Sequence, residues 1–588
     1  MPPSFLAMHK FSRAAPGHLL ARGALLLGVL GCSSPPPGAD SPIRIRWAQD
    51  PEALDPLRIS TPQAVEAANL LHCGLLQLNY ARRTFDPALA EAFPLRQLVG
   101  DSLTRLTYRL RAAARWDTGQ PVLARDVVFT LKLMACPGLP NEGTRTEYAF
   151  IQAVAPDAQD PRRFTITCAG QAPEYAQVSG NFPILSEASL DPTGRLRRFS
   201  LAQLRRWPAS QAPDTALVAL ARRYQRLGQS FSGCGPYRLA AWNKDRHVTF
   251  RRKTDWWADR LPAPVPVVLQ ARPRALRFAI IPNETTALLA LRRGEIDLYP
   301  QVTAAQSEQL LNSAQARRTV SLHTASSYNV VTVGFNTRRP TLSDALTRQA
   351  LSRLFDADGL LRATQRGAGV RTVGLISPGD KARYNDSLNL IPFDPASASA
   401  LLQQAGWRRT AGEWQRPAGD RAGFQRLRLT LRYRGDESLF ALVALQFRAS
   451  AAALDIPVEL LPGEAATLNQ LLQAGDFDVY IRTLKGNPFV FNFAPILGSQ
   501  YVGVSNLTGF GTPASDQFLA AVAAATTPTR QRQLLRRFQV LLQAQAPLVP
   551  LFILPTRIAA NRHVSGVVAT DLKPGYVVSA LHWSLPKD

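Results

Sequence analysis

The sequence predicts an α/β protein with more than one lobe, and three observations support this prediction. Segments with helical periodicity alternate along the chain with segments of strand-like alternation, which indicates helices layered on sheets. The chain has 588 residues, too many for a single hydrophobic core. Hydrophobic residues make up 46% of it and charged residues 19%, as in an ordinary globular protein.

The first 31 residues have the pattern of an export signal. Lys10, Arg13 and Arg22 precede an apolar run from Gly23 to Gly31, and no acidic residue appears before Asp40. The run is too short to span a bilayer but has the length of a signal-peptide core. We therefore expect an exported protein.

The end of this run, Val29-Leu30-Gly31-Cys32, resembles the lipobox of bacterial lipoproteins. The resemblance implies that residues 1–31 are removed, that Cys32 carries a lipid, and that the Pro-rich residues 32–42 form a tether. The alternative is an ordinary secretory signal whose cysteine is incidental. The expected location is the periplasm or cell envelope, with membrane lipid as a partner through Cys32.

The formal charge is +25, and +22 remains once Lys10, Arg13 and Arg22 are removed with the signal. The basic residues are scattered as short pairs such as Arg205-Arg206 and Arg536-Arg537. The chain has no zinc finger, no aromatic nucleic-acid-binding motif and no basic helix. We therefore predict a solvated basic surface and no nucleic-acid partner.

Four cysteines follow Cys32, namely Cys73, Cys136, Cys168 and Cys234. In an oxidising compartment they could form two disulfides in any of three connectivities, and the sequence does not choose among them. None lies in a CxxC motif, and the seven histidines form no HExxH motif or paired cluster. We predict no metal site and no cofactor.

The first elements alternate as the fold class requires. The Ile and Arg alternation of Ile43 to Ala48 predicts a strand with one buried face. Ala64 to Leu76 has helical periodicity. Leu103 to Arg111 alternates apolar and polar residues and is predicted to be a half-buried strand, whereas Asp126 to Met134 is predicted to be a helix with an acidic first turn.

Two later helices carry their own start and stop signals. Asn283 can cap a helix that ends at Gly294, after which Ile296 to Tyr299 resumes as a strand. Asp394 can cap a second helix, with proline at its first position and Gly406 as its stop.

Several blocks, in order, resemble one family. The clearest are AQDPEALDP from Ala48 to Pro56, LTYRLRAAARWDTGQPVLARD from Leu106 to Asp126, and GCGPYRLAAW from Gly233 to Trp242. Shorter matches follow, including Gly294-Glu295-Ile296-Asp297 and Phe477-Asp478-Val479. Together these blocks are similar to the solute-binding proteins of peptide, nickel and related ABC importers, known as extracellular solute-binding family 5.

This resemblance implies a periplasmic-binding-protein-like type II fold, with two lobes of mixed sheets and an extra inserted subdomain. The first lobe would combine residues 43–77, 216–320 and 554–588. The inserted subdomain would span residues 78–215, and the second lobe residues 321–553. Two chain crossings would make a hinge, and the solute would be buried between the lobes.

The resemblance also directs attention to the block from Phe477 to Pro488. Peptide binders of the family pair the ligand's α-amino group with an aspartate shortly after a tryptophan. Here Leu484 stands at the tryptophan position and Asn487 at the aspartate, beside Lys485. A neutral amide cannot supply the counter-charge of a buried ammonium, so an anionic or neutral solute is favoured over a free peptide N-terminus.

Matching positions suggest further ligand-binding candidates, for each of which a place in the core is an equal alternative. The candidate ligand-binding residues are Thr61, Tyr148, Ser326, Tyr328, Lys485 and Asn487.

The function implied by the resemblance is capture of a small solute, peptide-like or other, and its delivery to the permease subunits of an ABC importer. A monomer without enzymatic activity is expected. An exported hydrolase is one alternative, but the chain has no GxSxG motif and few histidines to act as a base. A sensing or chaperone-like lipoprotein of the same fold is another. The sequence leaves the identity of the solute open.

Overall fold

The computed structural model describes residues 40–57, 61–139, 141–207, 213–227, 232–418, 423–486 and 488–584. The export signal, Cys32 and Asn487 lie outside these ranges, so the predictions made for them remain predictions. Among the described helices, none combines the length and the apolar composition that a membrane crossing requires.

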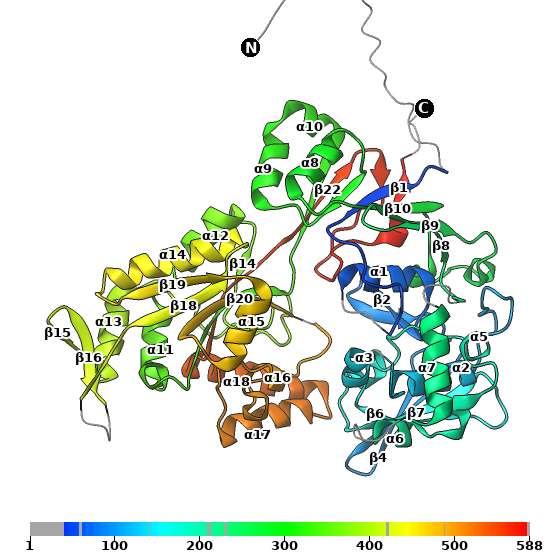
Figure 1. The fold of residues 1–588 in the computed structure, drawn as a ribbon, viewed down its shortest axis with the longest axis horizontal. Helices are drawn as coiled ribbons and strands as arrows, with labels where there is room; N and C mark the ends of the chain where they lie inside the picture. The colour runs from blue at the N-terminus through cyan, green and yellow to red at the C-terminus, as the bar shows by residue number, and fades with distance from the viewer. Residues whose placement is uncertain are drawn as a thin grey trace, which may run out of the picture. The chain divides into compact units, whose positions relative to one another are not determined.

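Two large sheets organise the described chain (Figure 1). The seven-stranded sheet has the order β12 (Val320–Ala325), β22 (Thr556–Asn561), β11 (Leu298–Pro300), β1 (Ile43–Trp47), β10 (Ala275–Ile280), β9 (His247–Arg252) and β8 (Tyr237–Asn243). The six-stranded sheet has the order β14 (Val370–Arg371), β21 (Leu548–Ile553), β13 (Asn329–Phe335), β20 (Val479–Lys485), β18 (Leu429–Arg434) and β19 (Val458–Gly463). Both are mixed: β1 runs parallel to β10 and β10 antiparallel to β9, while β18 runs parallel to β20 and β20 antiparallel to β13. The predicted α/β class with mixed sheets is confirmed.

The chain passes between the two sheets twice. Residues 326–328 join β12 to β13, and residues 554–555 join β21 to β22. The Ser327 hydroxyl donates to the backbone oxygen of Leu554, and the Leu554 N–H donates to the backbone oxygen of Asn329 at 2.9 Å. The two crossings are therefore hydrogen-bonded to each other. The division into lobes stays a prediction, although β12 still pairs within the first sheet up to Ala325.

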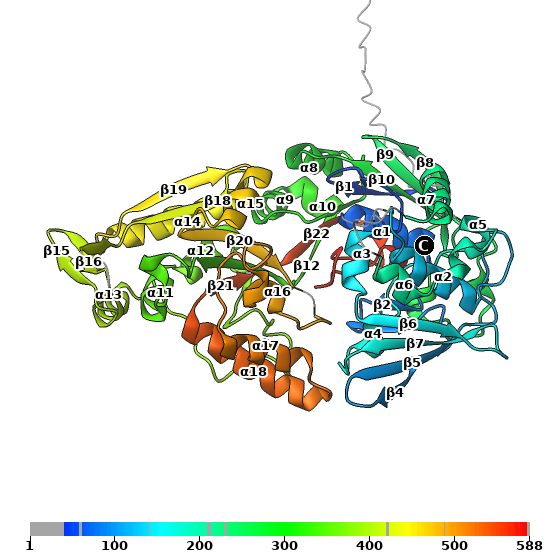
Figure 2. The same ribbon diagram turned by 60° about the horizontal axis from the view of Figure 1, so that its bottom comes forward.

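Smaller sheets occupy the segment after β1. The hairpin β2 (Leu76–Asn79) and β3 (Thr84–Pro87) is followed by a four-stranded sheet in the order β4 (Leu95–Val99), β5 (Leu103–Arg109), β7 (Arg163–Ala169) and β6 (Ile151–Pro156). Figure 2 shows these four strands side by side beneath α2 (Ala124–Met134), α3 (Glu142–Glu147) and α6 (Leu201–Arg205). The other helices here are α1 (Pro62–Leu71), α4 (Tyr175–Val178), α5 (Glu187–Leu190) and α7 (Thr215–Leu227).

The remaining elements follow in order along the chain. Beside the seven-stranded sheet lie α8 (Glu284–Arg292), α9 (Ala304–Asn312), α10 (Ala314–Thr319) and the short pair β23 (Val564–Ser565) and β24 (His582–Trp583). The segment that contains the six-stranded sheet adds α11 (Ala345–Ser352), α12 (Ala357–Gln365), α13 (Pro395–Gln404), α14 (Ser438–Ala452), α15 (Ala465–Ala474), α16 (Ala494–Leu497), α17 (Pro513–Ala523) and α18 (Pro528–Gln545). A three-stranded sheet is formed by β15 (Arg408–Thr410), β16 (Glu413–Pro417) and β17 (Phe424–Arg426).

The cores follow the sheets. One large cluster of buried side chains includes Phe278 of β10, in the seven-stranded sheet, and Phe164 of β7, in the four-stranded sheet. These two sheets therefore share one core. A second cluster surrounds the six-stranded sheet and includes Phe335 and Phe447.

Local capping explains why the predicted helices form where they do. Asn283 accepts a hydrogen bond from the Thr286 N–H at 2.9 Å, and Asp394 accepts one from the Ser397 N–H at the same distance. Gly294 and Gly406 both have positive φ, at 70° and 85°, as the predicted stops require.

Helix α1 differs from its prediction. The predicted helix ran from Ala64 to Leu76, but α1 ends at Leu71 and His72 is extended. The loop around Gly235 causes this end, because the Gly235 N–H donates to the Leu71 carbonyl at 3.0 Å and removes it from the helical ladder. A Cβ at Gly235 would lie 2.5 Å from the Leu71 carbonyl carbon, so only glycine permits this approach.

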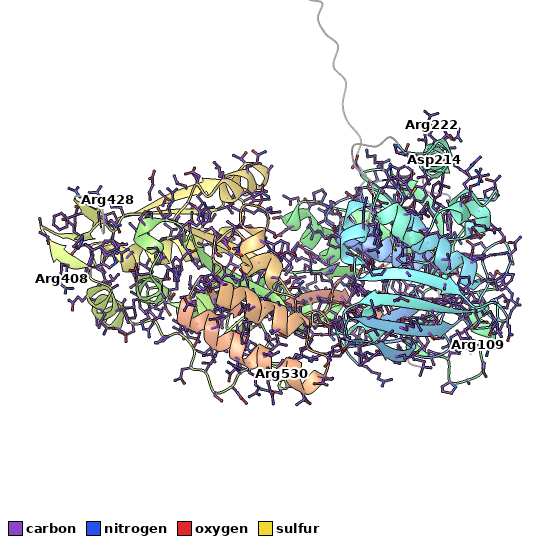
Figure 3. All side chains as sticks on the ribbon, turned by 90° about the horizontal axis from the view of Figure 1, so that it is seen from below. Arg109, Asp214, Arg222, Arg408, Arg428 and Arg530 are labelled. Carbon is purple, nitrogen blue, oxygen red and sulfur yellow. The ribbon has the colours of Figure 1, made fainter. Side chains whose placement is uncertain are left out.

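The basic residues are dispersed, as Figure 3 shows for its labelled arginines. Many are neutralised locally: Arg109 pairs with Asp160 at 2.8 Å, and Arg428 pairs with Glu413. The scattered basic surface predicted from the sequence is confirmed.

Candidate functional site

A cavity of about 1000 Å³ is the candidate site. Its wall combines α1, β2, the segments around Tyr148 and Phe182, and residues 573–579 near the C-terminus. Lys485, at the end of β20 in the six-stranded sheet, also lines it. The cavity therefore collects residues from distant parts of the chain, which is typical of ligand sites.

Helix α1 places a buried acid on this wall. Thr61 caps the helix, accepting the Ala64 N–H at 3.3 Å, and Pro62 fits its first turn. One turn on, Glu66 is only 7% exposed. A buried carboxyl needs hydrogen-bond partners, and the neighbouring elements supply them.

Two aromatic side chains bind the Glu66 carboxyl. Trp47, the last residue of β1, donates from Nε1 to Oε2 at 2.8 Å. Tyr576 donates its hydroxyl to Oε1. Burial raises the pKa of Glu66 to about 7, and these two hydrogen bonds oppose the rise only in part. Burial and the nearby Glu66 also raise the pKa of Tyr80, which lines the cavity as well. We name Trp47, Glu66, Tyr80 and Tyr576 the acid end of the cavity.

Tyrosine and phenylalanine line another part of the wall. The Tyr148 hydroxyl donates to the backbone oxygen of Asn181, and its ring packs edge-to-face on Phe182 with centroids 5.3 Å apart. Both hydrogen bond and ring contact fix the tyrosine, so this part offers an apolar surface of defined shape.

A second charged region is made by Lys485 and Lys573, which we name the lysine end. Lys485 ends β20, and the following Gly486 N–H donates to the backbone oxygen of Tyr328 at 2.8 Å. A Cβ at Gly486 would lie 2.7 Å from that oxygen, so glycine is needed for the close approach.

Lys573 lies in a tight turn whose ends are joined by a bridge between Ala569 and Tyr576. Within the turn, Asp571 pairs with Arg83 at 3.2 Å, and Gly575 has a φ of 102°. Partial burial, and then the charge of Lys485, lower the pKa of Lys573. The turn thus fixes both Lys573 and Tyr576 against the cavity.

The structure brings together three of the five described ligand-binding candidates. Thr61, Tyr148 and Lys485 line the cavity. Ser326 is exposed and Tyr328 half-buried at the crossing, and neither is among the lining residues. Whether any of the five contacts a ligand stays a prediction.

Sequence reasoning missed Glu66, Tyr576 and Lys573. Glu66 and Tyr576 are 510 residues apart, and no local pattern connects them. The one available signal was the position of Glu66 on a helix whose neighbours Ala67 and Leu70 are buried.

The four cysteines are free thiols in the structure, and all are buried. None of the pairings that the sequence leaves open is formed as a disulfide in it. Cys73 donates from Sγ to the backbone oxygen of Cys234 at 3.5 Å, and Trp256 and Trp257 donate to the same oxygen at 3.0 and 2.8 Å. Within the described ranges, no three His, Cys, Asp or Glu side chains gather as a metal site would require.

Two mixed sheets joined by paired crossings, with a large cavity, define the class: an α/β binding protein of the periplasmic type II architecture. The chain belongs to the bacterial extracellular solute-binding proteins, family 5, whose middle-region model matches residues 84–496. The family predicted from the sequence blocks is confirmed.

Relatives and solved structures agree with this family. Heme-binding protein A of Haemophilus influenzae is 24% identical over 494 residues, covering 81% of this chain and 80% of that protein. Protein XP55 of Streptomyces lividans is 25% identical over 543 residues, covering 89% and 86%. The structure of the periplasmic EDTA-binding protein EppA superposes with a TM-score of 0.74 at 19% identity, covering 94% of this chain and 98% of that one. NikA from Brucella suis, solved with Fe(III)-EDTA, gives 0.71 at 19% identity, covering 93% and 100%. At these identities the likeness establishes the fold.

Proposed function

We propose that this chain is a lipid-anchored solute-binding protein that captures a small solute in the cavity and hands it to an ABC importer without altering it. The observation that carries the proposal is the cavity itself, whose wall includes both α1 and Lys485 of β20. Because the chain crosses between the two sheets at residues 326–328 and 554–555, bending there would open and close this wall.

The relatives and solved structures differ in the ligand that they are named for or were solved with. One protein is called heme-binding, EppA is called EDTA-binding, and AppA of Bacillus subtilis was solved with a nonapeptide. The family therefore supports solute capture for this chain, and the solute must be argued from its own residues.

The test is native mass spectrometry of the protein purified from its own host, followed by identification of any released solute. We expect a bound small molecule that is recovered unchanged after incubation with the protein. Conversion of the molecule would overturn the proposal in favour of an enzyme. So would a protein that carries no solute and whose melting temperature no metabolite of a broad panel alters.

A cavity-filling variant tests where the solute lies. Val65 lines the cavity and is 42% exposed, so Val65→Trp should fill it without disturbing a packed core. The matched control is Leu289→Trp, because Leu289 has the same exposure on α8 and does not line the cavity. We expect Val65→Trp alone to lose the solute, and equal retention by both variants would contradict the assignment of the cavity.

Anchoring and delivery need separate tests. Cys32→Ala should release the protein from the membrane fraction if Cys32 carries the lipid. Deletion of the host's permease genes for the importer should abolish uptake of the identified solute. Membrane retention of Cys32→Ala would reject the anchor, and unaltered uptake would reject the transport role.

A further inference from the structure

The lysine end differs from the other charged groups of the cavity because neither lysine pairs with a counter-ion within the described ranges. Among the residues that the structure describes, no carboxylate pairs with Lys485 or Lys573. The nearest acid along the turn, Asp571, is buried and paired with Arg83. Both lysines therefore line the cavity without a counter-ion among the described residues.

The acids of the cavity do not compensate for these charges. Glu66 is held by Trp47 and Tyr576, and its burial favours the neutral form. Burial likewise raises the pKa of Glu147. Glu52, the third acid of the wall, has an interaction of its own within the chain. Lys485 and Lys573 are the basic residues among those that line the cavity, so its positive charge is concentrated at the lysine end.

Like charges held together are unfavourable unless something binds between them. Both lysines are positioned by well-defined backbone: Lys485 by β20 and the contact of Gly486 with Tyr328, Lys573 by the turn closed between Ala569 and Tyr576. An anionic group placed there would accept hydrogen bonds from two ammonium groups in a partly enclosed site.

We propose that the lysine end binds an anionic oxygen-bearing group of the solute, a carboxylate or a phosphate, while the apolar and aromatic wall holds an uncharged body. This inference rests on the proposed function, since it names the class of solute for the same cavity. The cavity of about 1000 Å³ exceeds what a free inorganic anion needs, and Tyr148, Phe182 and Leu70 on its wall suit an organic body.

The protein is first unfolded and refolded to remove bound solute. Its melting temperature is then measured with a panel of small metabolites in matched pairs. Each carboxylate is compared with its amide, and each phosphate ester with its alcohol. We expect the anionic member of a pair to raise the melting temperature and its neutral partner to fail. The carboxylate and phosphate arms then show which group is recognised. Stabilisation by neutral or cationic compounds alone would overturn the inference and leave the proposed function standing. No stabilisation by any compound would count against both.

Variants tie the effect to the two lysines. Lys485→Gln and Lys573→Gln should each weaken binding of the anionic compound about tenfold or more, because each removes a charge-assisted hydrogen bond. Lys573→Arg should retain most of the affinity since it keeps the charge. Lys244→Gln is the matched control, because Lys244 is exposed in the turn between β8 and β9 and does not line the cavity. Equal affinity in all four variants would overturn the assignment.

Discussion

The two charged ends of the cavity are held in opposite ways. At the acid end, Glu66 is buried and accepts hydrogen bonds from Trp47 and Tyr576, so its polar atoms are used within the chain. At the lysine end, Lys485 and Lys573 are exposed to the cavity and have no partner among the described residues. Groups already satisfied stabilise the fold, whereas unsatisfied charges are available to a ligand. The comparison predicts that changes at the acid end alter stability and changes at the lysine end alter binding.

The largest change in stability is expected from removing the Glu66 carboxyl, which accepts both hydrogen bonds at the acid end. Glu66→Ala leaves the Trp47 N–H and the Tyr576 hydroxyl buried without a partner, whereas Glu66→Gln keeps an acceptor oxygen. We expect Glu66→Ala to be less stable than Glu66→Gln by about 2–5 kcal/mol in the free energy of unfolding, measured by denaturant titration. Both variants are uncharged, so the difference reports the lost hydrogen bonds together with the lost packing of the side chain, and no change in charge. Equal stability would show that water or local rearrangement replaces the carboxyl.

The pH dependence of stability tests the raised pKa of Glu66. The pKa of Glu66 is about 7 in the folded protein, whereas its ordinary value is 4.5. Between these two pH values the folded state holds a proton that the unfolded state has released. Stability must therefore fall as pH rises from about 4.5 to about 7, by up to about 3 kcal/mol, and level off above that. The facing groups Tyr80 and Tyr576 have pKa values raised by burial and stay protonated throughout.

The comparison that isolates this effect is wild type against Glu66→Gln over the same pH range. It is needed because buried His72 has a pKa lowered to about 3, and so contributes stability that is lost as pH falls below about 6.5. That contribution is common to both proteins and cancels. A difference between them that does not change from pH 4.5 to 7 would show that Glu66 is ionised in the fold.

The elements of the fold could be predicted from the sequence because their signals are local. The caps of Asn283 and Asp394 act on residues three positions along, and a glycine stop acts on the turn before it. Helix α1 was predicted too long because its end depends on the Gly235 loop, far away in the chain.

The site was harder to predict for the same reason. Lys485 was found through the family block. The position of Lys573 beside the cavity and the hydrogen bond of Tyr576 to Glu66 could not be found in this way, because they depend on how the C-terminal turn folds against α1 and β20. Tyr328 matched by position, yet at the crossing it interacts with Asp571 and is not among the lining residues.

The cysteines bear on how firmly the acid end is held, because Cys73 follows α1. The sequence leaves three connectivities open. The contact between Cys73 and Cys234 favours the connectivity in which these two cysteines are paired. We expect oxidised glutathione to join this pair, each thiol giving up a proton and an electron as two glutathione molecules form. The bond should raise the free energy of unfolding by about 2 kcal/mol. Peptide mapping should find Cys73 joined to Cys234, and a crosslink of either one to Cys136 or Cys168 would contradict this pairing.

The smallest change in stability is expected from substitutions at the lysine end. The double substitution Lys485→Gln with Lys573→Gln removes two exposed charges that contact no counter-ion among the described residues, so the free energy of unfolding without solute should change by no more than about 0.5 kcal/mol. Loss of their mutual repulsion makes a slight gain the expected sign. Denaturant titration beside the Lys244→Gln control measures it. A loss above about 1 kcal/mol would mean that the lysines serve the fold as Glu66 does, and the contrast between the two ends would fail.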